Sequence, residues 1–149
     1  MEEIAKIKYE NYREQNKRLK KALTEGFYLE AIFIVYVMLE DRADAILRYT
    51  DTKVKGYGLK PKLRKIEEVS REKKAIAHKY FNTEYVNCLQ VWVEERNALM
   101  HALMKNTHEA KTIEEIAKQG EMLIKELCKK SQLYKKALIR NNQLVESQI

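Results

Sequence analysis

The scarcity of proline and glycine is the feature of this sequence that most limits its fold. The chain of 149 residues contains one proline and four glycines, and these residue types mark most turns and interrupt most regular elements. Residues that favour helices, chiefly Ala, Leu, Glu, Lys and Gln, fill the long stretches between them. We therefore expect an all-α fold, in a chain long enough for one domain with its own hydrophobic core.

The spacing of apolar residues predicts helices at about 2–24, 27–49, 62–80, 84–105 and 112–139. Residues 31–39 are apolar on every side, which is typical of a helix surrounded by others. Pro61 suits the first turn of the third helix, and Asn82 or Thr83 suits the cap of the fourth. These elements predict a bundle of four long helices plus a shorter one. Residues 1–140 form a single domain in this interpretation, and 141–149 a frayed tail.

Several functional classes are disfavoured by composition. Cys88 and Cys128 are far apart and no C-x-x-C occurs, so neither a disulfide framework nor a zinc site is indicated. The first residues are charged and do not resemble a signal peptide. The longest apolar run has nine residues, about half of what a membrane span requires. We expect a cytoplasmic protein with no cofactor and no membrane segment.

The net charge of +7 is concentrated in one region. Residues 53–79 hold ten Lys or Arg and three Glu, so the remainder of the chain is balanced. One interpretation is a surface for a polyanion, with Lys62, Arg64 and Lys65 as candidate RNA-binding residues. The other is a solvated, lysine-rich helix face. The sequence leaves both open.

Polar residues interrupt the apolar pattern of the fourth helix. Arg96 falls on the stripe that contains Trp92 and Leu99, while Asn97 and His101 lie one turn apart on a neighbouring stripe. Helical geometry places Arg96 and His101 about 140° apart and about 7.5 Å along the axis. Both side chains can border a groove, but they cannot both enter one narrow core. An arginine on an apolar stripe needs an acidic partner or an anionic ligand, and the candidate partners are Glu40, Asp41 and Asp44.

The sequence from Arg96 to His101, R-N-x-x-x-H, resembles the R-x4-6-H signature of the HEPN (higher eukaryotes and prokaryotes nucleotide-binding) superfamily, in which Asn commonly follows Arg. The resemblance implies a HEPN-like helical bundle that works as a homodimer. It also implies a metal-independent endoribonuclease, often a toxin or defence protein, with a possible antitoxin or operon partner. Catalysis would fall to Arg96 and His101, with Asn97 orienting them. Family toxins that are paired with a nucleotidyltransferase antitoxin commonly have Tyr where this chain has Leu103, which puts that type of regulation in doubt.

The residue types suit this chemistry. Cleavage of RNA by its own 2′-hydroxyl needs a base, an acid for the leaving 5′-oxygen and charge stabilisation on phosphate. Imidazole can fill either proton role, and a guanidinium can hold two phosphate oxygens. Each motif contains one histidine, so two histidines would require two chains around a twofold axis.

A second hypothesis comes from a different class of protein. The chain would be a non-catalytic helical module that binds nucleic acid or a partner protein through its basic third helix. The position of His101 distinguishes the two hypotheses. An exposed imidazole in a groove shared by two copies favours the enzyme, and one sealed in the core favours the module.

Overall fold

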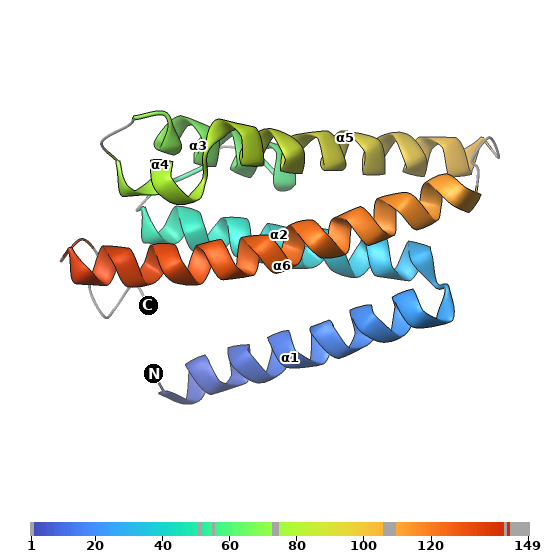
Figure 1. Cartoon of the computed structure of the whole chain (residues 1–149), viewed down its shortest axis with the longest axis horizontal. Coiled ribbons are helices and arrows are strands. Elements are labelled where there is room, and N and C mark those ends of the chain that lie inside the picture. Colours follow the sequence, from blue (N-terminus) through green and yellow to red (C-terminus); the bar gives the residue numbers. More distant parts are fainter. Residues whose placement is uncertain are drawn as a thin grey trace.

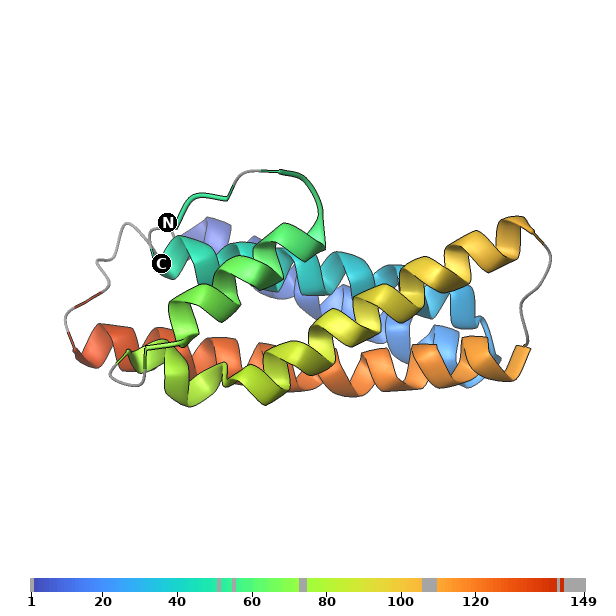
Figure 2. The same ribbon diagram turned by 90° about the horizontal axis from the view of Figure 1, so that it is seen from above.

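A computed structural model describes residues 2–50, 52–54, 56–72, 75–105, 110–141 and 143 (Figure 1). These residues contain helices and no strand, which confirms the all-α prediction. The long helices lie roughly along the long axis of the molecule, some running in one direction and some in the other (Figures 1 and 2). They are α1 (Glu2–Glu25), α2 (Tyr28–Tyr49), α3 (Leu59–Ser70), α4 (Ile76–Tyr80), α5 (Thr83–Met104) and α6 (Ala110–Arg140).

The predicted third helix at 62–80 is wrong as a single element. The first helix in this region, α3, begins earlier than predicted, at Leu59. The helical conformation is interrupted between α3 and α4, where Ala75 is extended with φ −72° and ψ 139°. The ring Nδ1–H of His78 donates to the Ser70 carbonyl at 2.8 Å, joining the two pieces. Beyond α4, Phe81 is buried and meets the Tyr134 ring of α6 edge-on, at 5.2 Å between centroids. Packing on α6 therefore overrides the local preference for one continuous helix.

The ends of the other helices lie close to their predicted places. The Asn82 side chain accepts a hydrogen bond from the Tyr85 amide at 2.9 Å and caps α5, as predicted. Helix α6 begins at Ala110, two residues before the predicted start. Of the predicted frayed tail, only 141 and 143 belong to the described residues.

Gly26 ends α1 with a tight reversal. Its φ of +79° is a left-handed conformation that favours glycine. The Gly26 amide donates to the Leu23 carbonyl and the Phe27 amide to the Ala22 carbonyl, at 3.4 and 2.8 Å. This pair of bonds is a Schellman motif, which satisfies carbonyls that a helix end leaves open. It turns the chain directly from α1 into α2.

Helix α2 is the centre of the core. It packs against α1, α3 and α6, and eleven of its residues are buried. Its burial is less complete than the apolar sequence predicts, because Phe33 and Val37 are exposed. Helix α1 contributes only Leu19 and Ala22 to the buried core, both near its C-terminal end.

Two buried hydrogen bonds fix the crossing of α5 and α6. Trp92 Nε1–H donates to the Ile116 carbonyl at 2.9 Å, and the Tyr85 hydroxyl donates to the Leu123 carbonyl at 3.1 Å. These bonds satisfy the polar ends of two large side chains that are otherwise packed in apolar surroundings. Gly120 permits the close approach, because a Cβ there would lie 2.9 Å from Trp92 Cζ2.

Gly120→Ala tests this close approach. Helix propensity alone would stabilise the protein by about 1 kcal/mol. We expect net destabilisation instead, of about 1–3 kcal/mol, because the rigid, hydrogen-bonded indole cannot move aside easily. Urea unfolding, followed by the fluorescence of Trp92, measures the effect. The exposed neighbour Gln119, changed to Ala, is the control and should have little effect; a Gly120→Ala protein more stable than the parent would contradict close packing.

Candidate functional site

The motif on α5 lies where α3 begins. Helix α3 packs against both α2 and α5 and so lies between them. At its first residue, the Leu59 amide donates a long hydrogen bond of 3.5 Å to the Tyr36 hydroxyl of α2. The Arg96 guanidinium of α5 lies over the same Tyr36 ring, with Cζ 4.2 Å from the centroid. Helix α5 continues beyond the N-terminal end of α3 (Figure 2).

Arg96 is partly buried and is held without a carboxylate. Its Nη1 donates to Asn97 Oδ1 at 3.0 Å, and its Nε is buried with no hydrogen-bond partner. Glu40, Asp41 and Asp44, the candidate partners from the sequence, form ion pairs with other cations. Lys62 Nζ lies 3.0 Å from Glu40 and 2.9 Å from Asp44, and Arg42 bonds Asp41. The expected ion pair of Arg96 does not form among the described residues.

Arg96, Asn97 and His101 line one open depression together with Lys60. Its volume of about 440 Å³ is in the range of small-molecule sites. His101 is exposed, so it is accessible rather than sealed in the core. Lys60 comes from the first turn of α3 and forms an ion pair with Glu94 of α5. Glu94 lines the depression as well, so the depression combines an arginine without an acidic partner, an accessible imidazole and a lysine–glutamate ion pair.

This arrangement suits the binding of an anion by Arg96 next to His101, a side chain that can donate or accept a proton. The flat face of the Arg96 guanidinium rests on Tyr36, and Asn97 takes up one of its N–H groups. Arg96 lines the depression, so the Nη donors that Asn97 does not use can bind phosphate oxygens there. Among the described residues, no three His, Cys, Asp or Glu side chains are grouped as metal ligands.

The basic region of α3 offers less free charge than its sequence indicates. Lys62 joins Glu40 and Asp44, and its side chain is only 15% exposed. Lys65 Nζ lies 2.9 Å from Glu68 in the next turn. Arg64 is exposed and forms no ion pair with a described residue. Of the three candidate RNA-binding residues, Arg64 alone presents an unneutralised charge.

Two residues of the depression's surroundings were missed by sequence reasoning. Tyr36 lies inside the apolar run of α2, where nothing in the pattern distinguishes it from a core residue. Lys60 counts in the sequence only as one cation of the basic region. Their roles depend on which helices meet, and no local signal could have revealed them.

None of the described helices is both long and apolar enough to cross a membrane. Comparisons with protein families, with characterised proteins and with solved structures found no match to this chain. The site must therefore be interpreted from its own geometry.

Replacing Lys62 tests its structural role. Lys62→Met leaves Glu40 and Asp44 without their shared cation, so we expect a loss of about 1 kcal/mol in the free energy of unfolding. The matched control is Arg64→Met on the same helix, which should stay within about 0.5 kcal/mol of the parent. Urea unfolding at low salt measures both. Equal stability of the two variants would show that Lys62 is as dispensable as Arg64.

Proposed function

We propose that the chain is a metal-independent endoribonuclease of the HEPN type, acting through Arg96, Asn97 and His101. The observation that carries the proposal is the partly buried Arg96, which has no carboxylate among the described residues and borders the same depression as the exposed His101. A buried guanidinium without a partner is costly. A phosphate held in the depression would supply the missing anion.

The reaction uses the 2′-hydroxyl of the substrate. A base removes its proton, the 2′-oxygen attacks phosphorus, and the bond to the 5′-oxygen breaks as that oxygen receives a proton. The products are a 2′,3′-cyclic phosphate and a free 5′-hydroxyl. His101 acts as the base that takes the 2′-hydroxyl proton or as the acid that protonates the 5′-oxygen. Arg96 stabilises the negative charge that develops on phosphate, and Asn97 orients Arg96 by accepting its hydrogen bond of 3.0 Å.

A homodimer would bring two such sites together. Helices α2 and α5 are antiparallel, so Met104 lies beyond Arg96 in the direction of the α2 N-terminus (Figure 1). Three apolar side chains in the N-terminal half of α2 and at the C-terminal end of α5 are exposed: Leu29 by 43%, Phe33 by 63% and Met104 by 89%. Exposed apolar groups beside a polar site favour an interface. A second copy that covers them would place two His101 residues, an acid and a base, near one phosphate.

The biological setting rests on the resemblance of the motif alone. A toxin or phage-defence ribonuclease in the cytoplasm is the setting that the resemblance favours. The alternative of a non-catalytic module bound through α3 is less supported, because ion pairs neutralise Lys62 and Lys65.

Cleavage of single-stranded RNA in the presence of EDTA tests the chemistry. We expect 2′,3′-cyclic phosphate ends from the parent protein. His101→Ala should lower the rate by about 10²–10⁴-fold, because the proton-transfer group is lost. Arg96→Ala should lower it by roughly 10²–10³-fold through lost charge stabilisation. Arg96→Lys should recover only part of the loss, because an ammonium lacks the two-pronged geometry.

The control is Glu95→Ala, an exposed residue of the same helix, which should cleave like the parent. Circular dichroism and light scattering must show each variant folded and in the parent's oligomeric state. Full activity of His101→Ala, or activity that depends on added metal, would exclude the proposed mechanism.

The dimer has its own test in Phe33→Asp. Because Phe33 is 63% exposed, the monomer should stay folded, whereas a carboxylate in an apolar interface should separate the copies. We expect a dimer for the parent and a monomer for the variant by light scattering at micromolar concentration, with cleavage lost in the monomer. The control is Ile7→Asp, on α1 and 51% exposed, which should remain dimeric. A monomeric parent with full activity would exclude a shared site.

A further inference from the structure

Four cations from three helices gather beside the C-terminal half of α2. They are Lys8 of α1, Arg42 and Arg48 of α2, and Lys135 of α6, and we call them the three-helix cluster. Arg48 and Lys135 both lie against the Tyr49 ring, and Lys8 and Arg42 line one pocket between α1 and α2. They lie on a different part of α2 from Tyr36 and the depression at Arg96.

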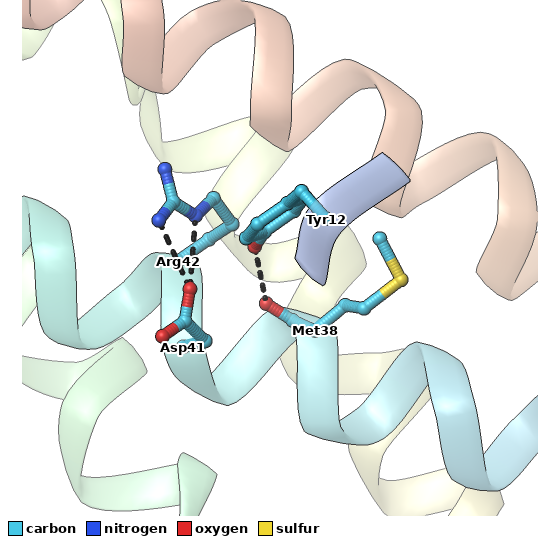
Figure 3. A network of polar contacts seen from close by, with 4 residues as sticks. All are labelled: Tyr12, Met38, Asp41 and Arg42. Carbon is cyan, nitrogen blue, oxygen red and sulfur yellow. Dashed lines mark hydrogen bonds and ion pairs between the residues drawn. The ribbon is translucent and has the colours of Figure 1, made fainter. Parts of the chain in front are cut away.

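Two tyrosine rings support these cations. Arg42 Cζ lies 4.5 Å from the centroid of the Tyr12 ring. The Tyr12 hydroxyl donates to the Met38 carbonyl (Figure 3). Arg48 Cζ and Lys135 Nζ share the Tyr49 ring, at 5.8 and 5.9 Å from its centroid. Cation–π contacts of this kind fix the direction of a cation but do not neutralise its charge.

The cluster contains much more positive than negative charge. Arg42 donates to Asp41 through Nη2 at 2.9 Å and Nε at 3.3 Å (Figure 3). Within the described part of the chain, no carboxylate forms an ion pair with Lys8, Arg48 or Lys135. Asp44, one turn before Arg48, is bonded to Lys62. One carboxylate therefore accompanies four cations.

This crowding costs free energy at Lys135. Its side chain is partly buried, and burial together with the charges of Arg42, Arg48 and Lys8 lowers the pKa of its ammonium. A lowered lysine pKa means that the surroundings disfavour the charged form. A bound anion would reverse this effect, because it would bring a negative charge to four cations that lack one.

We propose that the three-helix cluster is a second anion site, which binds backbone phosphates of an RNA strand that also occupies the Arg96 depression. The identity of this ligand rests on the proposed function, whereas the charge imbalance does not. Arg42 and Arg48 are six residues apart on α2, about 9 Å along the axis. That span exceeds one phosphate group and fits a chain of phosphates better than a single small anion.

A strand that reaches both sites passes around α2. Tyr36, which supports Arg96, precedes Arg42 by six residues and Arg48 by twelve, so the two sites are separated by about 9–18 Å along the helix and by about 120° around it. A pocket of about 200 Å³ adjoins the cluster, lined by Lys8, Tyr12 and Arg42 among others. It gives the strand a recess between α1 and α2.

The test measures RNA binding without cleavage. In a His101→Ala background, Arg48→Gln/Lys135→Gln removes two cations of the cluster. If each contacts a phosphate, the slope of log affinity against log salt should flatten by about 1.4, and affinity at 0.1 M salt should fall roughly 25-fold. The matched control is Lys129→Gln/Lys136→Gln, which removes the same charge from exposed positions of α6. The control should keep the parent's slope.

The thermal stability of each protein completes the comparison. Relief of repulsion should leave the melting temperature of the cluster variant unchanged or higher. Binding to phosphatidylserine vesicles and to inorganic pyrophosphate is measured alongside RNA binding. Three results would overturn the inference: an equal loss of RNA affinity in variant and control, no RNA affinity in the parent, or a variant that loses affinity for the vesicles or pyrophosphate but not for RNA.

Cleavage is assayed separately with His101 intact. Binding that depends on the cluster, in a protein that never cleaves RNA, would end the proposed ribonuclease function and leave the second site standing. If the parent cleaves RNA and the cluster variant changes neither cleavage nor binding, the second site is excluded and the proposed ribonuclease function stands.

Discussion

Helix α2 loses most of its surface to α1, α3 and α6, and the positions of the other helices follow from that burial. Its partner α3 has 12 residues against 22 in α2, so one side of α2 is covered over only part of its length. The uncovered part exposes Phe33. Tyr36 stands at the boundary, where Arg96 reaches it from α5. The candidate site therefore exists because a short helix leaves a long one incompletely enclosed.

The distribution of carboxylates decides where the protein can attract anions. Lys62 and Lys65 belong to the most basic stretch of sequence, but both form ion pairs. Arg96, Arg48 and Lys135 lie outside that stretch and have no carboxylate partner among the residues that the structure describes. Because a paired cation offers little to a second anion, the free cations give a better guide to ligands than the net charge of a segment.

Local signals predicted most of the helices, because the spacing of apolar residues and caps such as Asn82 are properties of neighbouring positions. The break between α3 and α4 could not be predicted, since it depends on Phe81 meeting Tyr134, far along the chain. The motif gave Arg96, Asn97 and His101 as candidates. Arg96 lacks an acid among the described residues because Glu40, Asp41 and Asp44 form ion pairs with Arg42 and Lys62 in the folded chain, and no local pattern reveals those pairs.

Tyr36 serves two helices with different parts of one side chain. Its hydroxyl accepts the first amide of α3, and its ring supports the Arg96 guanidinium. A substitution at position 36 therefore affects the contact with α3 and the contact with Arg96 together. An aliphatic residue would give up both contacts, whereas phenylalanine would keep the ring and lose only the hydroxyl. Among homologues that share this geometry, position 36 should accept few residue types even though it lies outside the R-N-x-x-x-H motif, and changes there should be coupled to changes at 96.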